Sequence, residues 1–404
     1  MPKDRFIVLA HRFRQLDCLL TDERRWWQYQ PYHHLGLAFA KEAPALVECL
    51  EALSLDEIAR LDGDMGALCT LLAPWIPAGA ELQALSELAD FVPEPVQCAR
   101  TMAMYMPGRK QAQIEAFTGC LPPHPGPYLE WCAGKGHLGR LVSLHRGADI
   151  LSLEWQGELC EEGRRLAARD GASMQFVEAD AFAAESGGLI APHHHAMALH
   201  ACGDLHTHLL EQVAERGASG VTLSPCCYHL IRGDRYRPLS EAAQASALRL
   251  GKSDLKLPLQ ETVTGGARIA RLREQEVVWR LAFDCLQRQV RGVDEYLPVP
   301  NLQKSLLAGG FEAFCHWAAE RKGIRLPTGL DYAAFLAQGE RRFGDVARME
   351  LVRHLFRRPL EVWLLLDRAL FLEEQGYQVE VGTFCPKPMT PRNLLIRAVR
   401  AGGV

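Results

Sequence analysis

A glycine-containing loop is the clearest chemical motif in the sequence. It reads Glu130-Trp-Cys-Ala-Gly-Lys-Gly-His-Leu-Gly139 and follows a short apolar run that is typical of a buried strand. Gly134 and Gly136 allow the backbone to turn tightly and to approach a ligand where a side chain would collide. The first N–H groups of a following helix have no partner within that helix and favour a polar ligand. The loop therefore predicts a site for a nucleotide-like ligand.

Three acidic residues stand at the ends of successive predicted strands: Glu130, Glu154 and Asp180. The loop also matches the pattern G-x-G-x-x-G, and Glu154 lies twenty residues after Gly134, so an NAD enzyme is one interpretation. A carboxylate at Glu130 is awkward beside a pyrophosphate but suits the cationic amino group of methionine. We therefore favour S-adenosylmethionine (SAM), with Glu154 at the ribose hydroxyls and Asp180 at the adenine amine. The structural alternative is that all three residues are ordinary helix N-caps.

Cysteine and histidine side chains follow the fourth and fifth predicted strands, in His200-Ala-Cys-Gly-Asp204 and Ser224-Pro-Cys-Cys-Tyr-His229. These strands are neighbours in a doubly wound sheet, so their carboxyl ends should surround one small volume beside the ligand crevice. Zinc binding is one interpretation, although paired C-x-x-C spacing is absent. A second is that the cysteines pack as small buried hydrophobes. A third is a catalytic wall that faces a methyl acceptor, and no residue is assigned to a metal.

Methyl transfer requires an aligned acceptor and removal of its proton. His200 or His229 could serve as the general base, and Asp204 could orient either imidazole or accept the proton itself. Pro225 and Tyr228 would hold a flat acceptor group through a rigid backbone and an aromatic face. The residues expected to contact the acceptor are Ser224, Pro225, Cys226, Cys227, Arg271 and Arg273.

Short β-type runs alternate with helical lengths from about residue 101, which predicts a parallel sheet covered by helices. The five runs are 128–132, 149–154, 174–177, 196–200 and 220–224. A closing helix over 360–375 and two strands over 378–385 and 393–399 follow. This arrangement suits a seven-stranded methyltransferase sheet with an antiparallel last strand better than a classical dinucleotide domain. We therefore predict an α/β fold with a Rossmann-like class I methyltransferase sheet.

Helical segments flank and interrupt this sheet. We predict an N-terminal helical region over 1–100, a core over 101–235, a basic helical insertion over 236–358, and a helix with two strands over 359–404 that complete the sheet. The insertion carries 20 Lys and Arg against 14 Asp and Glu. That excess suggests an RNA surface, although a solvated arginine-rich helix face explains it equally well. The clustered arginines are Arg268, Arg271, Arg273, Arg280, Arg288 and Arg291.

Composition sets the broad class of protein. The 404 residues are 48% hydrophobic and 23% charged, which describes a globular chain of two or three domains at about 150 residues each. Thirteen cysteines, an odd number without a repeating frame, indicate reduced thiols in a cytosolic protein. The first residues lack the apolar core of a signal peptide, and Asp367 stops the apolar run over 362–366, so we expect no membrane segment.

Taken together, the motifs resemble a methyltransferase-like family of class I SAM-dependent enzymes. The resemblance covers roughly residues 101 to 400. At the H-x-C-G and C-C-x-H motifs, this family is similar to the eukaryotic tRNA 2′-O-methyltransferases. The segments that carry it are Met106-Pro-Gly-Arg-Lys110, Glu130 to Leu138, His200-Ala-Cys-Gly-Asp204, Cys226-Cys-Tyr-His229, Leu366-Asp-Arg-Ala-Leu370 and Pro391-Arg-Asn393.

The resemblance implies SAM binding by the glycine loop and places Arg109 and Lys110 over the cofactor or the acceptor. Cys132 stands where many class I enzymes have glycine, which narrows the room beside the methionine moiety, and Lys135 replaces a small residue. The residues implied to contact SAM are Arg109, Lys110, Glu130, Cys132, Gly134, Gly136, Glu154, Asp180 and Ala181.

These observations lead us to expect a cytoplasmic SAM-dependent methyltransferase that acts on RNA, either tRNA or rRNA. One alternative is a protein methyltransferase whose basic insertion recognises an acidic partner. Another is a non-catalytic binding module that keeps the fold. Neither alternative involves a membrane.

Overall fold

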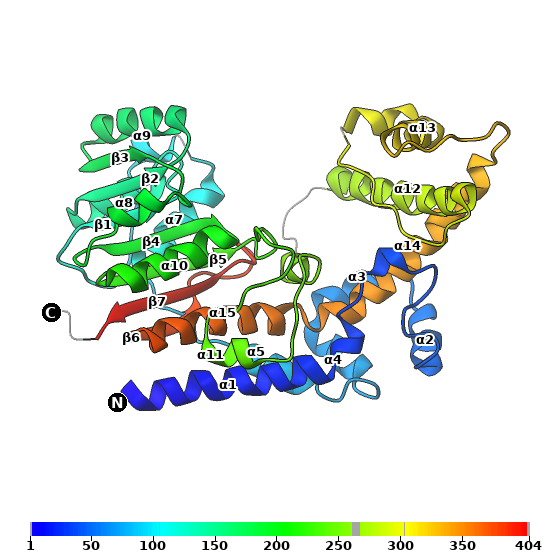
Figure 1. Ribbon diagram of the computed structural model, residues 1–404, viewed down its shortest axis with the longest axis horizontal. Coiled ribbons are helices and arrows are strands. Elements are labelled where there is room, and N and C mark those ends of the chain that lie inside the picture. Colours follow the sequence, from blue (N-terminus) through cyan, green and yellow to red (C-terminus); the bar gives the residue numbers. More distant parts are fainter. Residues whose placement is uncertain (1, 105, 261–266, 303, 402–404) are drawn as a thin grey trace. The chain divides into compact units, whose positions relative to one another are not determined.

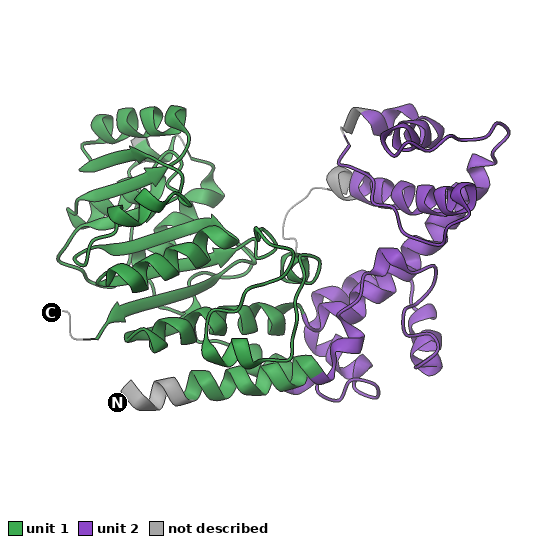
Figure 2. Ribbon diagram, viewed as in Figure 1, with its two compact units in different colours: residues 1–21, 82–263, 357–404 green, residues 22–81, 264–356 purple. Residues whose placement is uncertain are grey.

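The computed structural model describes residues 2–104, 106–260, 267–302 and 304–401. The chain forms two compact units (Figure 2). Unit 1 comprises residues 1–21, 82–263 and 357–404, and unit 2 comprises residues 22–81 and 264–356. None of the described helices is long and apolar enough to cross a membrane.

Unit 1 contains a seven-stranded sheet with the order β3-β2-β1-β4-β5-β7-β6 (Figure 1). The strands are β1 (Tyr128–Trp131), β2 (Ile150–Glu154), β3 (Met174–Glu178), β4 (His195–Cys202), β5 (Gly220–Cys226), β6 (Tyr377–Thr383) and β7 (Leu394–Arg400). Strands β1 to β5 are parallel, and β7 is antiparallel to both β5 and β6. The predicted seven-stranded α/β sheet with an antiparallel last strand is confirmed.

Helices cover both faces of this sheet. The helices of unit 1 are α1 (Pro2–Asp22), α5 (Gly79–Ser86), α6 (Arg100–Ala103), α7 (Gly108–Cys120), α8 (His137–Arg146), α9 (Gly157–Asp170), α10 (Asp204–Arg216), α11 (Glu241–Ala245) and α15 (Arg357–Glu374), with α1 and α5 crossing its boundary. Helices α7, α8 and α9 pack on one face, and α10 and α15 on the other. Strands β1 and β5 are therefore buried along their whole length, which explains their near-continuous apolar sequences.

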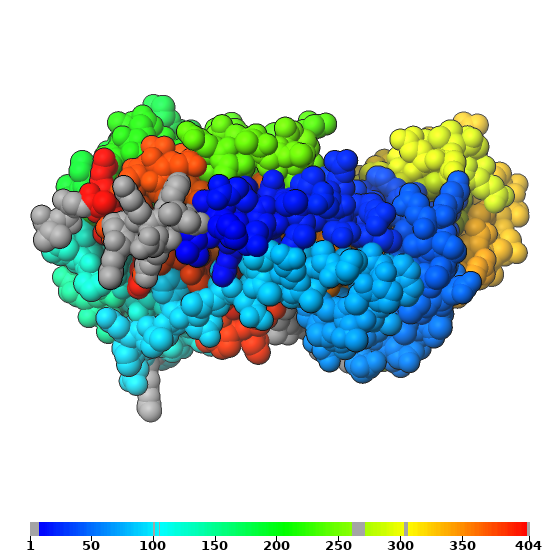
Figure 3. Space-filling view, turned by 90° about the horizontal axis from the view of Figure 1, so that it is seen from below, coloured from blue at the N-terminus to red at the C-terminus, as the bar shows by residue number. Residues whose placement is uncertain are grey.

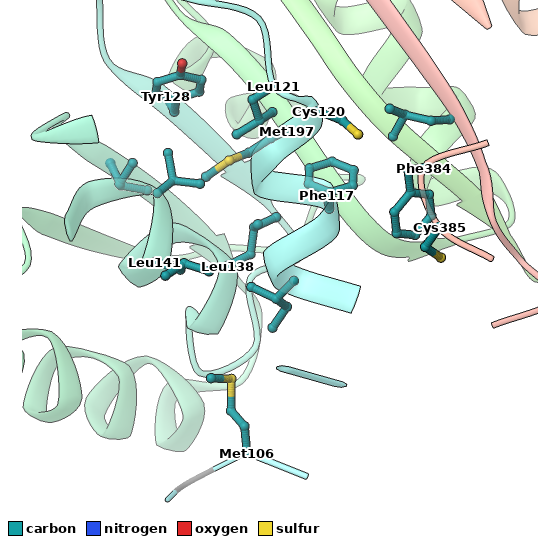
Figure 4. Close-up of a cluster of buried hydrophobic side chains, with 14 of the residues drawn as sticks. Met106, Phe117, Cys120, Leu121, Tyr128, Leu138, Leu141, Met197, Phe384 and Cys385 are labelled. Carbon is teal, nitrogen blue, oxygen red and sulfur yellow. The ribbon is translucent and has the colours of Figure 1, made fainter. Parts of the chain in front are cut away.

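The core beneath α7 and α8 is a single apolar cluster (Figure 4). Phe117 of α7 meets Phe384 edge to face with ring centroids 6.0 Å apart. Leu138 and Leu141 of α8 and Met197 of β4 complete the contact, all of them buried. Burial of each such side chain contributes about 1.5–3 kcal/mol, so this cluster fixes where α8 begins relative to the strand ends.

Helix α15 anchors the segment that follows β5. Asp367 is fully buried and accepts hydrogen bonds from the Tyr236 hydroxyl and from the backbone N–H of Ser240, the latter at 2.7 Å. Arg368, also buried, donates to Nε2 of His206 at 2.8 Å and to the Tyr236 hydroxyl at 3.0 Å. Buried charges are stable only with such partners. The Leu366-Asp-Arg motif is therefore part of the scaffold of unit 1.

Helix α1 packs on α15, which explains why residues 1–21 belong to unit 1. The rings of Phe13 and Trp363 have centroids 5.2 Å apart, and Asp17 accepts a 2.9 Å hydrogen bond from the Trp363 indole. Arg12 donates to the carbonyl of Glu87 at 2.8 Å. Figure 3 shows α1 in dark blue beside the lighter blue segment that follows α5.

Unit 2 is helical. Its helices are α2 (Pro44–Glu51), α3 (Leu55–Gly63), α4 (Met65–Leu72), α12 (Ala267–Arg291), α13 (Phe311–Arg321) and α14 (Tyr332–His354). Asp284 of α12 is buried and pairs with Arg288 at 2.9 Å and with Arg342 of α14 at 2.8 Å. Arg342 also donates to the carbonyls of Tyr32 and His34. This network joins the two chain segments of unit 2.

The observed division therefore differs from the one expected from sequence. Residues 22–81 associate with 264–356 instead of forming a separate N-terminal region, and residues 82–100 join the sheet unit. Unit 2 as a whole has 18 Lys and Arg against 21 Asp and Glu, a net charge of −3. The positive charge expected over 236–358 is thus balanced by acidic residues of 22–81, which the sequence pattern had not assigned to the same unit.

The contact between α12 and α14 depends on Gly339. A Cβ atom there would lie 2.6 Å from Cβ of Ala282 and 2.6 Å from the carbonyl oxygen of Val278. We expect Gly339→Ala to lower the free energy of unfolding of unit 2 by about 1–3 kcal/mol, because overpacking forces the helices apart. Hydrogen–deuterium exchange of the α12 and α14 amides measures this loss. Gly66→Ala is the control, since its Cβ makes only one ordinary 3.6 Å contact, and equal protection in both variants would contradict the prediction.

Candidate functional site

Backbone strain marks one edge of the sheet. Among the described residues, the non-glycine positions with positive φ are Cys132 at 58°, His200 at 75° and Cys227 at 49°. They follow or end β1, β4 and β5, whose carboxyl ends flank the point where the strand order reverses. A left-handed backbone costs such residues about 1–2 kcal/mol. Strain of this kind concentrates at functional sites, and doubly wound sheets bind ligands at this edge.

Glu154 fixes the glycine loop. It is buried at the end of β2, and its carboxylate accepts from the backbone N–H of Gly134 at 2.8 Å and of Gln156 at 3.0 Å. Gly134 has a φ of 59°, and a Cβ atom there would have no heavy atom within 4 Å. The carboxylate keeps further lone pairs for ribose hydroxyls, and Gly134 leaves open the side that a ligand would occupy.

The other two glycines of the loop have packing roles. A Cβ on Gly136 would lie 2.5 Å from the ring of Phe176, and a Cβ on Gly139 would lie 2.4 Å from Oε2 of Glu130. Both positions let the first turn of α8 press against the sheet. Gly136 therefore has a role in helix packing, and its contact with the cofactor stays a prediction.

Glu130 belongs to β1, and its side chain lies against β2 and α8. It is 4% exposed and accepts a 2.9 Å hydrogen bond from the Ser152 hydroxyl. Burial raises the pKa of Glu130 to about 7, against the opposing effects of Ser152, the Gly139 N–H and the charges of Lys110 and Arg140. A carboxyl group of this kind sits ready to become ionised when a cationic group approaches. Its contact with the methionine amino group stays a prediction.

Residues after β3 lie at the same edge of the sheet. Asp180 is exposed and accepts a 2.9 Å hydrogen bond from the N–H of Phe182, while Ala181 is buried beside it. Cys132 is half-buried after β1, and burial raises the pKa of its thiol to about 12, so it is a neutral side chain. Contacts of these three residues with SAM also stay predictions.

Arg109 is held by two backbone carbonyl groups. Its guanidinium donates to the carbonyl oxygens of Met389 at 2.7 Å and Pro388 at 3.2 Å, so it ties α7 to the loop between β6 and β7. Lys110, the next residue, is exposed, and its charge opposes protonation of both Glu130 and His200. Lys110 therefore lies near the site, and the expectation that Arg109 lies over the cofactor or the acceptor stays a prediction.

His200 occupies a bulge at the end of β4. The register between β4 and β5 shifts between Leu199 and Cys202, and His200 takes its left-handed backbone inside that shift. Its Nε2 hydrogen-bonds to the amide oxygen of Gln113 at 3.1 Å. Because an amide oxygen only accepts, Nε2 carries the proton and Nδ1 keeps a lone pair. Burial lowers the pKa of His200, so the imidazole is neutral near pH 7.

Asp204 and Tyr228, both expected in the catalytic group, have structural roles. Asp204 accepts a 2.6 Å hydrogen bond from the N–H of Arg232, while its own N–H donates to Leu230 at 3.0 Å. Tyr228 is 1% exposed, with the Arg368 guanidinium 5.1 Å from its ring centroid. The Tyr228 ring is covered by the core and cannot hold an acceptor group, whereas the catalytic role expected for the half-buried Asp204 stays a prediction.

Ser224 and Pro225 are buried inside β5, and the Ser224 hydroxyl donates to the carbonyl of Arg392 at 3.4 Å. They belong to the sheet and do not offer a surface to an acceptor. His229 is half-buried, and burial lowers its pKa. Its Nδ1 is buried without a hydrogen-bond partner in the described structure.

Three cysteines converge where β4 and β5 end. The sulfur atoms of Cys202 and Cys226 are 3.5 Å apart, and those of Cys202, Cys226 and Cys227 all lie within 4.8 Å of one another. Cys226 is buried, whereas Cys202 and Cys227 are partly exposed. The thiols of Cys202 and Cys226 can donate to the Cys227 sulfur, which lowers the pKa of Cys227. The structure confirms that these three side chains lie together in one small volume.

Cationic side chains beside the site were missed by the sequence reasoning. Arg232, Arg235 and Lys256 follow β5 and are exposed, and the Arg232 guanidinium lies 4.8 Å from the centroid of the Phe182 ring. The run Arg232-Gly-Asp-Arg-Tyr-Arg237 directly after the cysteine motif was the available signal. This run has fewer positive charges than the insertion, so the sequence pattern favours the insertion as the RNA surface.

The arginines of the insertion are mostly engaged within unit 2. Arg280 bonds Glu276 and two backbone carbonyls, Arg288 bonds Asp284, and Arg291 bonds Gln287. Arg271 and Arg273 are exposed on α12. The side chain of Arg268 lies outside the described side chains. The proposed cluster of six cationic groups is therefore reduced to Arg271 and Arg273 among the described side chains.

Comparison with known proteins finds a matching domain model and two similar structures. Residues 109–234, just under a third of the chain, match the model of a methyltransferase domain. The 23S rRNA methyltransferase ErmE is similar at 17% identity, covering 63% of this chain and 99% of its own, with a TM-score of 0.23. Coclaurine N-methyltransferase bound to N-methylheliamine and SAH is similar at 12% identity, covering 77% and 95%, with a TM-score of 0.26.

The matched segment contains the glycine loop, Glu154 and the ends of β4 and β5, and it lies in a sheet whose β7 is antiparallel between β5 and β6. This combination defines the Rossmann-like fold of class I methyltransferases. The protein is a SAM-dependent methyltransferase, with SAM as its methyl-donating cofactor.

Gly134 provides a direct test of the loop. We expect Gly134→Ala to weaken SAM binding by about tenfold or more, equivalent to about 1.4 kcal/mol, because the new methyl group enters the open side of the loop. Isothermal titration with SAM measures the change. Gly147→Ala is the matched control, since Gly147 has a φ of 64°, also has no atom near a new Cβ, and ends α8 away from the site. Unchanged affinity in Gly134→Ala would rule out this placement of the ligand.

Glu130 should make stability depend on pH. Its folded pKa of about 7 exceeds the ordinary value of 4.5, so the folded state holds the proton more tightly and stability falls as pH rises from about 4.5 to 7. We expect Glu130→Gln to remove roughly 2 kcal/mol of the decrease between pH 5 and pH 8. Urea unfolding at both pH values measures it, with the exposed Glu158→Gln as control. The same pH dependence in wild type and Glu130→Gln would contradict the assignment.

Proposed function

We propose that this methyltransferase acts on RNA, in the cytoplasm, with structured tRNA or rRNA as the substrate. The observation that carries the proposal is the set of exposed cationic residues after β5, beside the strained strand ends. Residues 231–260 hold six Lys and Arg against three Asp and Glu, and Arg232, Arg235 and Lys256 are exposed. Lys110 adds a further exposed charge at the start of α7. Phosphate contacts dominate RNA affinity, so cations here would hold a backbone beside the site.

The motif pattern supports the same substrate class. The H-x-C-G motif at His200 and the C-C-x-H motif at Cys226 are similar to those of tRNA 2′-O-methyltransferases, which favours tRNA and a ribose hydroxyl acceptor. The exposed Arg271 and Arg273 of unit 2 are a second candidate contact for the RNA, although unit 2 carries a net charge of −3.

His200 is the general base in this proposal. SAM supplies an electrophilic methyl group on its sulfonium. That methyl group would be transferred to an acceptor oxygen or nitrogen, and Nδ1 of His200 would take up the acceptor's proton. Gln113 fixes the imidazole through Nε2, so Nδ1 keeps its lone pair. The left-handed backbone of the bulge sets the direction of the side chain. A neutral imidazole is suited to accept that proton near pH 7. His229 is the alternative base.

The substrate class can be measured with labelled methyl groups. Full-length enzyme and radiolabelled SAM are incubated with total RNA and with total protein from cells that lack the enzyme, with and without nuclease. We expect label in nuclease-sensitive material. Label only in protein would replace the proposal with a protein methyltransferase, and SAM binding without label in either fraction would favour a non-catalytic binding module.

The cationic segment after β5 can be tested separately. We expect the double variant Arg235→Glu, Lys256→Glu to raise KM for RNA and to lower the slope of log KM against log salt by about 2, or about 1 for each phosphate that is no longer neutralised. Affinity for SAM should not change. Arg216→Glu, at the end of α10 and so at the opposite edge of the sheet, is the control. Equal effects of the double variant and the control would refute a role for this segment, and a larger effect of Arg271→Glu, Arg273→Glu would move the RNA-binding surface to α12.

A further inference from the structure

The three converging cysteines have the geometry of a metal site. A zinc ion lies about 2.3 Å from each thiolate sulfur, and tetrahedral geometry then separates two sulfurs by about 3.8 Å. The sulfur atoms of Cys202 and Cys226 are 3.5 Å apart, and no pair among Cys202, Cys226 and Cys227 exceeds 4.8 Å. Small side-chain rotations would therefore bring all three sulfurs to bonding distance from one ion.

The backbone around these cysteines is built to bring them together. Cys202 pairs with Cys226 across β4 and β5 only because the bulge at His200 shifts the register. Without that shift, the side chain of Cys202 would point to the other face of the sheet, since side chains alternate along a strand. Cys227 follows Cys226 directly in the chain, and it has a left-handed backbone where its sulfur converges with the other two.

Hydrogen bonds lock the two turns that carry the cysteines. The N–H of Gly203 donates to the carbonyl of Cys226 at 3.1 Å, and the N–H of Asp204 donates to that of Leu230 at 3.0 Å. A Cβ on Gly203 would lie 2.1 Å from the carbonyl oxygen of Leu230, so the close approach requires glycine. The site is thus held by main-chain contacts that exist before any ion binds, which reduces the ordering cost of binding.

Packing alone does not explain these features. A cysteine that serves as a small buried hydrophobe needs neither exposure nor a strained backbone, yet Cys202 and Cys227 are partly exposed and Cys227 has a φ of 49°. By contrast, Cys120 and Cys385 pack in the apolar cluster beneath α7 and show neither feature.

We propose that Cys202, Cys226 and Cys227 bind one zinc ion through three thiolates, with the fourth coordination position open on the acceptor side of the methyltransferase site. Thiolates are the preferred ligands of zinc, and binding releases the protons of the coordinating thiols. Three protein ligands leave one position for water or for an atom of the acceptor, the arrangement found in catalytic zinc sites. His229, two residues after Cys227, is not among the three converging ligand atoms. The proposal concerns metal binding and does not depend on which acceptor the enzyme uses.

The test uses the full chain, purified under reducing and oxygen-free conditions, without RNA or SAM. We expect one zinc ion per chain by elemental analysis and, after replacement with Co²⁺, sulfur-to-cobalt charge-transfer absorption together with the visible bands of tetrahedral cobalt. Cys202→Ser, Cys226→Ser and Cys227→Ser should each weaken Co²⁺ binding by about tenfold or more, or about 1.4 kcal/mol. His229→Ala should keep the charge-transfer bands, and their loss would refute the three-thiolate ligand set.

The control is Cys98→Ser, which changes a partly exposed cysteine of unit 1 away from the cluster and should bind Co²⁺ as wild type does. Circular dichroism identifies any variant that fails to fold, and for wild type the rise in melting temperature on adding Zn²⁺ gives a second readout. Absence of stoichiometric metal and of charge-transfer absorption in folded wild type would overturn the proposal, as would a Cys202–Cys226 disulfide in protein taken directly from cells. Failure of RNA methylation would leave these results untouched.

Discussion

The candidate site depends on one backbone constraint, which is that the turns after β4 and β5 are tied to each other. Gly203 and Asp204 donate main-chain hydrogen bonds into the β5 turn, and the Asp204 carboxylate accepts one back from Arg232. This tie begins directly after the bulge at His200 and holds the end of β4 against the turn after β5. Loss of the tie would release the imidazole, the cysteines and the cationic segment together, since all of them stand on these two turns.

The glycine loop shows that residues of one motif can serve different purposes. Gly134 faces open space, while Gly136 and Gly139 are required because α8 packs closely on Phe176 and Glu130. Glu154 then fixes the loop through two backbone N–H groups. A ligand therefore meets a preformed loop whose shape is maintained by the core of the sheet, so little ordering is needed on binding.

The sequence was sufficient to predict the seven strands, because buried parallel strands with intervening amphipathic helices have a strong pattern, as in β4, α10 and β5. It also predicted that Cys202, Cys226 and Cys227 meet. It could not predict the roles of Asp204 and Tyr228, since whether a polar side chain faces a site or a neighbouring turn depends on tertiary contacts. Nor could it show that residues 22–81 balance the charge of 264–356, because Arg342 and the carbonyls it contacts are about 300 residues apart in the chain.

The position of β7 has a consequence for synthesis of the chain. This strand lies between β5 and β6, yet it is made after both of them and after the whole of unit 2. On the ribosome, the edge of β5 therefore stays without its final partner while more than 160 further residues are translated. An open strand edge invites pairing with other chains. The helical unit 2 can form during that interval, and arrival of β7 then closes the sheet and protects the strand that carries Cys226 and leads directly into Cys227.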